Sequence, residues 1–200
     1  MKNITAFAVT SVIALFSFAP ASVLQVGAAM PKADVKMLDI SGTEISLKDA
    51  AGPNGTLVMF SCNTCPYVIK NQDRTNSVLG YATDKKVGVA VLNSNEGQRN
   101  GADSYEAMKD YAKEQGYKWY YAIDKNNELA DAFGASRTPE VFLFDKSGVL
   151  VYHGAIDDSP SDASSVKRQH LKTAIDEMIG GKDVSVKKSK SIGCAIKRKG

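Results

Sequence analysis

The sequence predicts an α/β protein with a mixed central β-sheet, helices on both faces and an N-terminal β-hairpin extension. Apolar runs that suit strands alternate along the chain with segments that suit helices, and the alternation ends in a hairpin. The runs at 57–61 and 140–144 are apolar almost throughout, so both are expected near the centre of the sheet, where each face is covered.

The N-terminal half supplies a hairpin, two strands and the first helix. Residues 35–49 alternate around Ser41-Gly42, which is typical of a hairpin. The runs 57–61 and 87–93 are rich in apolar strand formers and are bounded by turn residues. Residues 66–83 lie between them and are expected to form a helix with an incomplete apolar face.

The next segment is expected to hold two helices with a strand between them. Ser104 follows a polar loop and is a good N-cap for a helix that stops at Gly116. Residues 119–123 read "WYYAI" and suit a strand. A short helix over 128–133 is ended by Gly134.

The C-terminal part closes the sheet and adds a last helix. The strands 140–144 and 149–153 flank Asp-Lys-Ser-Gly at 145–148, a sequence that favours a hairpin turn. Apolar residues then recur at helical spacing from Val166 to Ile179, before Gly180-Gly181.

Residues 1–21 have the pattern of a secretory signal peptide. A positive N-terminus with Lys2 precedes a stretch of small and apolar residues, and 19–21 reads Ala-Pro-Ala, so cleavage is expected after Ala21. An uncleaved membrane anchor is the alternative, although polar residues interrupt a stretch that is short for a span. We therefore expect a periplasmic or secreted protein with no stable membrane insertion after cleavage.

The remaining chain is expected to form one domain. Residues 22–33 are assigned to a linker, 34–181 to the domain and 182–200 to a basic C-terminal tail with a short docking strand. The tail has seven Lys and Arg and one Asp, a charge of +6 within a chain of net charge +3. Because no aromatic residues are interleaved with these charges, a solvated end is favoured over a nucleic-acid partner.

The segment "FSCNTCPYVIK" at 60–70 carries the chemistry. Cys62 and Cys65 lie where a strand passes into a helix, which is where reactive groups gather in open α/β sheets. A helix starting near Cys62 or Asn63 places Cys62 at its positive end, where a thiolate is stabilised. Cys62 is then the attacking thiol of a thiol-disulfide exchange, and Cys65, one turn on, is the resolving thiol.

Other uses of a C-x-x-C pair fit this chain less well. Apart from these two cysteines, the nitrogen and sulfur ligands are Cys194, His153 and His170, scattered singly, so no metal is expected. Covalent haem needs a histidine where Pro66 stands, so no cofactor is expected. A static disulfide across two residues closes too small a ring to stabilise the fold much.

The chain resembles the thioredoxin superfamily over about residues 34–196, and specifically its redoxin or AhpC/TSA-like branch. The resemblance is carried by the C-x-x-C-P motif after an apolar strand, by "GASRTPEVFLFDKSGVLVYHG" at 134–154, by the last helix and by "SIGC" at 191–194. It implies a thioredoxin-like fold, with Pro139 as the cis-proline beside the cysteines. Thr138 and Pro139 are then the substrate-binding residues, and the partners are protein dithiols or disulfides and a redox partner protein.

The motif departs from thioredoxin at several positions. Ser61 stands where thioredoxins have tryptophan, Asn63-Thr64 replaces their Gly-Pro, and Thr56 falls near their buried acid. Glu140 is the candidate to replace that acid.

Two other functions remain open at this point. A peroxiredoxin-like thiol peroxidase would use Cys65, although Val58 and Cys62 replace the proline and hydroxyl residue of the peroxiredoxin motif, and Arg137 is the available arginine. The other alternative is a redox-inert binding module, in which replacing either cysteine changes no thiol-transfer rate.

Cys194 has two interpretations. In "SIGCAIK" it alternates with Ile192 and Ile196, as in a short strand that docks on the body of the protein. It is either a buried, inert thiol or a third redox thiol that exchanges with Cys62.

Overall fold

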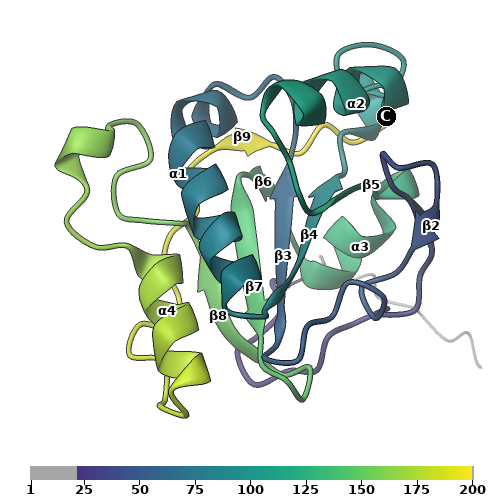
Figure 1. Cartoon of the computed structure of the whole chain (residues 1–200). Helices are drawn as coiled ribbons and strands as arrows, with labels where there is room; N and C mark the ends of the chain where they lie inside the picture. The colour runs from purple at the N-terminus through teal and green to yellow at the C-terminus, as the bar shows by residue number, and fades with distance from the viewer. Residues whose placement is uncertain (1–21, 200) are drawn as a thin grey trace, which may run out of the picture.

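The computed structural model describes residues 22–199 and confirms the predicted α/β class with a mixed central sheet. Its centre is a five-stranded mixed sheet with the strand order β5-β4-β3-β7-β8 (Figure 1). The strands are β3 (Thr56–Ser61), β4 (Gly88–Asn93), β5 (Tyr120–Ile123), β7 (Glu140–Phe144) and β8 (Leu150–Gly154).

The predicted signal peptide, residues 1–21, lies outside the described residues. Within residues 22–199, the structure contains no helix that combines the length and the apolar character needed to cross a membrane.

The pairing of the strands follows the predicted topology. β3 pairs in parallel with β4, and β4 in parallel with β5. On its other side β3 pairs antiparallel with β7, which forms the closing hairpin with β8. The apolar runs around 57–61 and 140–144 therefore occupy two interior positions of the sheet, as the sequence predicted.

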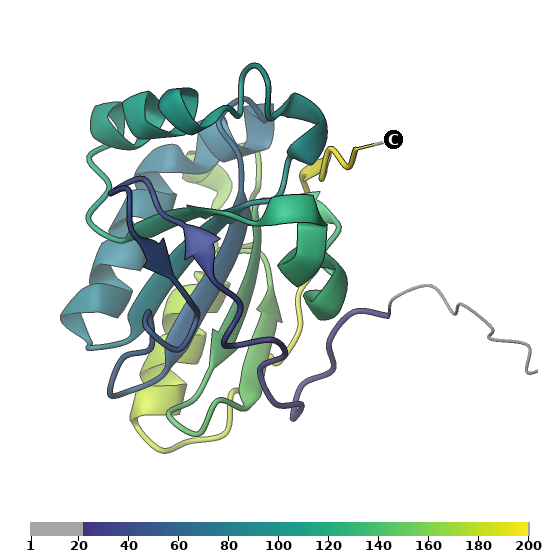
Figure 2. The same cartoon turned by 90° about the vertical axis from the view of Figure 1, so that its right-hand side faces the viewer.

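Side chains along β3 alternate between the two faces of the sheet, and other elements of the fold cover both faces. Leu57 and Met59 pack against α1 (Pro66–Asp84), α2 (Tyr105–Glu114) and α4 (His170–Ile179). Val58 and Phe60 pack on the opposite face, against α3 (Glu128–Phe133) and the hairpin of β1 (Met37–Leu38) and β2 (Glu44–Ile45). Figure 2 shows α3 and the hairpin together on this second face.

The last helix begins later than its apolar period suggests. α4 starts at His170, whereas Val166 follows a short 3-10 turn and has an extended backbone. The Asp158 carboxylate accepts a hydrogen bond from the backbone N–H of Lys167 (3.0 Å), which holds this segment in a loop before the helix. Local side-chain to backbone bonding has overridden the apolar pattern here.

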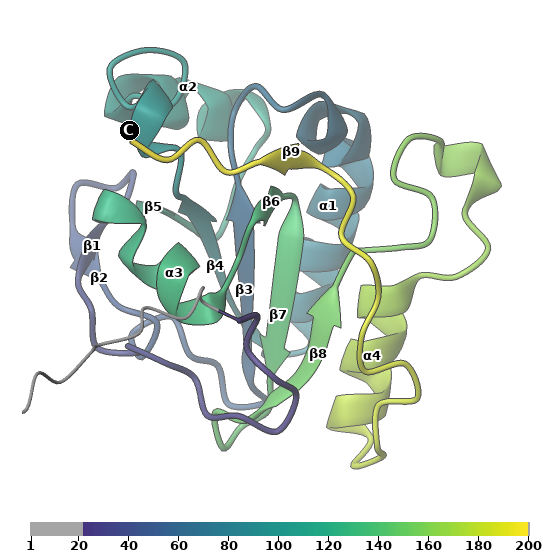
Figure 3. The ribbon, with the colours of Figure 1, turned by 180° about the vertical axis from the view of Figure 1, so that it is seen from behind.

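The C-terminal segment docks on the body of the protein as a short strand in a separate two-stranded sheet. β9 (Cys194–Ala195) pairs antiparallel with β6 (Arg137–Thr138), the two residues before Pro139. Figure 3 shows this segment passing β8 and then crossing beside β6 and the start of α1.

Replacing Phe133 with alanine is expected to lower the free energy of unfolding by about 3–5 kcal/mol, because a fully buried aromatic side chain is lost and a cavity remains. Phe133 contacts Phe60, Phe142 and Phe144 with ring centroids 5.5, 5.1 and 5.7 Å away. Urea denaturation would measure the change. Ile179→Ala is the control, because Ile179 is 37% exposed and its loss should cost much less.

Candidate active site

The two cysteines of the C-x-x-C motif lie at the junction of β3 and α1. α1 begins at Pro66, and Cys65 is its N-cap residue with φ −68° and ψ 124°. Both cysteines are buried, with Cys62 2% and Cys65 3% exposed. The helix thus begins at Pro66, as expected for the segment 66–83, and not near Cys62 or Asn63, the start that would have placed Cys62 at its positive end. Pro66 occupies the first helical position, where its missing N–H costs nothing, and this shifts the positive end of the helix to Cys65.

The negative charge of the reduced pair is stabilised at Cys65. A hydrogen bond from the Cys62 thiol lowers the pKa of Cys65 to about 4, assisted by the Cys194 thiol and by backbone N–H groups, including that of Val68. The same bond to Cys65, together with burial, raises the pKa of Cys62 well above its ordinary value. The prediction that Cys62 is held ionised is wrong, because the hydrogen bond to Cys65 and burial both raise the pKa of Cys62.

Thr138 contacts both sulfurs from the loop before Pro139. The Thr138–Pro139 peptide bond is cis, as the resemblance implied. The Thr138 hydroxyl lies 3.4 Å from the Cys62 sulfur, and the Cys65 thiol donates to the Thr138 carbonyl oxygen across 3.2 Å when it is protonated. The residues predicted around the C-x-x-C pair are thus brought together, although Pro139 is 74 residues beyond Cys65 in the sequence.

Cys194 lies beside Cys65 and not beside the thiol that the sequence suggested. Its sulfur is 2.7 Å from the Cys65 sulfur. Burial and the neighbouring Cys65 raise the pKa of Cys194, so this thiol is protonated beside the Cys65 thiolate. Cys194 is partly exposed, unlike the two buried cysteines.

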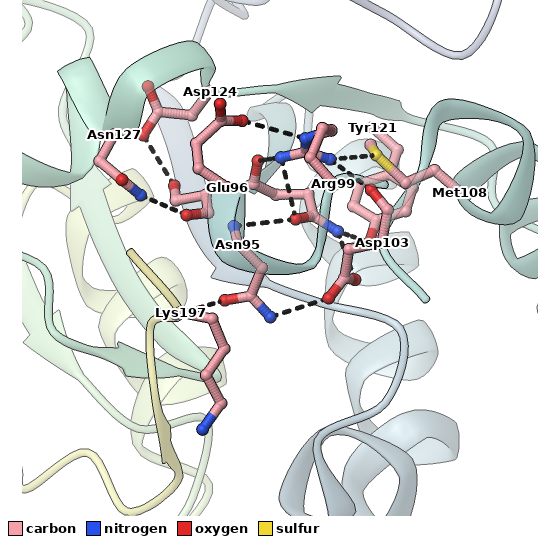
Figure 4. A network of polar contacts seen from close by, with 11 residues as sticks. Asn95, Glu96, Arg99, Asp103, Met108, Tyr121, Asp124, Asn127 and Lys197 are labelled. Atoms are coloured by element: carbon pink, nitrogen blue, oxygen red, sulfur yellow. Dashed lines mark hydrogen bonds and ion pairs between the residues drawn. The ribbon is translucent and has the colours of Figure 1, made fainter. Parts of the chain in front are cut away.

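Sequence reasoning missed a buried polar network, of which Figure 4 shows Asp103, Asn95 and Tyr121. The network holds Asn63, the residue after Cys62. The Asp103 carboxylate accepts hydrogen bonds from the Asn63 backbone N–H (2.9 Å) and from the side-chain amides of Asn93 (2.8 Å) and Asn95 (2.9 Å). The Tyr121 hydroxyl donates to the Asn63 side-chain oxygen (2.7 Å). The available signal was the density of Asn and Asp directly after β4, which was interpreted only as a polar loop.

Glu140, the candidate to replace the buried acid of thioredoxin, holds the loop before Pro139, and among the described residues no hydrogen bond joins it to a sulfur. Its buried carboxylate accepts hydrogen bonds from the backbone N–H groups of Ser136 (2.9 Å) and Arg137 (3.0 Å), and it lies 2.6 Å from the ring nitrogen of His153. The His153 ring stacks on Phe142 with ring centroids 4.4 Å apart. The Arg137 guanidinium donates to the Gly193 carbonyl (3.3 Å).

Within residues 22–199, no three His, Cys, Asp or Glu side chains are grouped so that they could hold a metal ion. The chemistry that this site supports is that of its three sulfurs.

Comparison with known proteins identifies the family. The family model for Redoxin matches residues 25–169, which is most of the chain. The chain belongs to the Redoxin family. This confirms the predicted redoxin branch of the thioredoxin superfamily and a redox enzyme class.

Individual relatives agree with this assignment. The chain is 28% identical over 134 residues to the thiol-disulfide oxidoreductase ResA of Bacillus thuringiensis, covering 67% of this chain and 72% of the relative. It is 33% identical to an uncharacterized conserved protein from Geobacillus kaustophilus, with a TM-score of 0.81 over 88% of this chain and 93% of the other. The thioredoxin domain of a Bacteroides vulgatus thiol-disulfide oxidoreductase, 17% identical with a TM-score of 0.59 over 78% of this chain and 99% of that domain, shares the fold.

Asp103→Asn is expected to lower the free energy of unfolding by about 1–3 kcal/mol. The Asp103 carboxylate oxygens accept hydrogen bonds from buried N–H groups. The asparagine side chain has an NH2 group in place of one of these oxygens, so it cannot accept all of these bonds, and buried N–H groups lose their acceptor. Urea denaturation would measure the difference. Asp110→Asn, on the exposed side of α2, is the matched control and should change stability by less than about 0.5 kcal/mol. Equal free energies of unfolding of the two variants would show that the Asp103 network does not stabilise the fold.

The reduced protein is expected to lose stability as the pH falls from about 8.5 toward about 4. In this window the unfolded Cys65 thiol takes up a proton, because its ordinary pKa is about 8.5, whereas the folded thiol, with a pKa of about 4, stays ionised. Unfolding therefore binds a proton. Urea denaturation at several pH values, compared with Cys65→Ser, would isolate this contribution, and parallel pH profiles of the two proteins would refute it.

Proposed function

We propose that the protein is a thiol-disulfide oxidoreductase that exchanges disulfides with protein substrates through Cys62 and Cys65. The observation that carries the proposal is the pair of hydrogen-bonded thiols at the start of α1, with opposite pKa shifts, beside Thr138 and a cis-Pro139. Thiol-disulfide exchange proceeds by attack of a thiolate on a disulfide sulfur through a mixed disulfide, and a thiol of low pKa leaves faster. The relative named ResA is a thiol-disulfide oxidoreductase, which supports the same assignment.

The substrate sulfur bonds to Cys62 and is released by Cys65. The surroundings of the Cys65 sulfur are occupied by Cys194, by the Thr138 carbonyl and by the helix amides. Cys62 attacks a substrate disulfide after its proton has been lost, forming a mixed disulfide. The Cys65 thiolate then attacks the Cys62 sulfur, and the substrate leaves as a thiolate that takes up a proton. In the reverse direction, Cys65 is the leaving thiol, and its low pKa favours departure.

Thr138 and Pro139 are the proposed substrate-binding residues, as the family resemblance implies, and a substrate chain pairs with Thr138 when β9 has moved away from β6. The substrates are protein dithiols or disulfides, and a redox partner protein restores the pair. The pattern of residues 1–21 supports a periplasmic or secreted location, in which protein disulfides persist.

Thiol peroxidase activity is the second candidate. The pKa of about 4 at Cys65, the residue that matches the peroxidatic position, favours it because the thiolate is the form that peroxide oxidises. Val58 and the position of Arg137, which bonds to Gly193, do not support it. Peroxide turnover that needs Cys65 and survives Cys62→Ser would favour the peroxidase over the oxidoreductase.

The Cys65→Ser variant is expected to accumulate a mixed disulfide at Cys62 when it is incubated with insulin as a model protein disulfide, because the resolving thiol is absent. Trypsin leaves residues 49–70 in one peptide and 191–197 in another, so mass spectrometry separates adducts at Cys62 from adducts at Cys194. Cys62→Ser should form no stable adduct in the 49–70 peptide. An adduct on Cys65 in that variant, with none on Cys62 in the other, would reverse the proposed roles.

A further inference from the structure

The C-terminal segment is fixed by its backbone from two sides. In addition to the β6–β9 pairing, the Ile196 N–H donates to the Ser136 carbonyl (3.0 Å). On the opposite side the Lys197 carbonyl accepts from the Gly97 N–H (2.7 Å), and the Lys197 N–H donates to the side-chain oxygen of Asn95 (2.8 Å). The segment therefore has a defined position across the end of the sheet (Figure 3).

Side chains fix the register of this segment. Ile196 is 5% exposed and belongs to the core cluster that contains Leu129 and Phe133. Gly193 lies so close to β6 that a Cβ atom on it would overlap the carbonyl oxygen of Thr138. A residue with a side chain at 193 would push β9 away from β6, so this glycine permits the approach that places Cys194 at the active site.

The result is a row of three thiols with Cys65 in the middle. Cys65 is hydrogen bonded to Cys62 on one side, and its sulfur lies 2.7 Å from that of Cys194 on the other. The 2.7 Å separation is a short distance from the S–S bond length of about 2.0 Å, so little movement is needed to bond the two sulfurs once Cys65 is already part of a disulfide. Cys62 and Cys194 are therefore alternative partners of one central sulfur.

We propose that Cys194 is a third redox thiol, which converts the Cys62–Cys65 disulfide into a Cys65–Cys194 disulfide. The Cys194 thiol gives up its proton, and its sulfur attacks the Cys65 sulfur. The Cys62–Cys65 bond breaks, and Cys62 leaves with the bonding electron pair and takes up a proton. One disulfide is lost and one is formed, so no oxidant or reductant is consumed. The inference rests on the proposed function, because the starting disulfide is the product of that exchange.

The exchange would move the disulfide toward the surface. Cys62 and Cys65 are buried, whereas Cys194 is partly exposed. A redox partner protein can thus meet the disulfide at Cys194 without entering the buried pair. The same bond would fix β9 covalently beside β6, the edge at which a substrate chain is proposed to pair.

Disulfide mapping in single variants tests the inference. Reduced Cys62→Ser protein is incubated with glutathione disulfide and digested with trypsin under conditions that prevent exchange. We expect a cross-link between the 49–70 and 191–197 peptides in most of the protein. Cys194→Ser is the matched control, and it should form a disulfide within the 49–70 peptide.

The two variants separate failure of the inference from failure of the proposed function. If Cys194→Ser closes its disulfide while Cys62→Ser keeps free thiols or carries only glutathione adducts, the third redox thiol is refuted and the proposed function stands. If Cys194→Ser fails to close, the proposed function is refuted. Circular dichroism of each variant would establish that it is folded.

A second pair of variants tests the role of the docked segment without removing a thiol. In the Cys62→Ser background, Gly193→Ala should reduce the yield of the cross-link at least about fivefold, because the added Cβ displaces β9. Gly80→Ala is the control, since a Cβ there meets nothing within 4 Å. An unchanged yield with Gly193→Ala would show that docking of β9 does not bring the two sulfurs together.

Discussion

Thr138 is the residue on which the geometry of the site depends. Its hydroxyl contacts Cys62, its carbonyl oxygen contacts Cys65, and its backbone pairs with Cys194 in the β6–β9 ladder. Thr138 therefore contacts or pairs with all three cysteines, which come from two distant segments of the chain. Glu140 supports this arrangement from behind, because its buried carboxylate holds the backbone N–H groups that precede Thr138. A carboxylate used in this way stabilises a loop and has no need to reach a sulfur.

A second constraint comes from the polar network after β4. Asp103 holds the backbone of Asn63, and thereby the turn between the two cysteines, while Asn95 bonds both to Asp103 and to the backbone of Lys197. One buried carboxylate thus connects the C-x-x-C turn with the C-terminal segment. Buried polar groups are costly unless they are paired, so a network in which each member supports another fixes both segments together.

In a C-x-x-C motif, one cysteine is often expected both to bond to the substrate and to carry the stabilised negative charge. In this site the two properties belong to different cysteines. Hydrogen bonds from the Cys62 thiol, from the Cys194 thiol and from the Val68 N–H stabilise the charge on Cys65, while Cys62 keeps its proton and lies against the Thr138 hydroxyl. The stabilised thiolate is then the thiol that resolves or leaves. The sulfur that bonds to the substrate need not be the most acidic one, because the pair shares a proton across a hydrogen bond.

The sequence by itself determined the order and type of nearly every element and the closeness of Cys62 and Cys65, because apolar periods, turn residues and a three-residue spacing act locally. Only the tertiary structure decided which thiol is ionised, since that depends on the hydrogen bonds that Cys62 and Cys194 make to Cys65 and on the start of the helix at Pro66. It also decided that Cys194 meets Cys65, 129 residues away, and that Asp103 holds Asn63, 40 residues away. Contacts between distant segments follow from how whole elements pack, and no local pattern records them.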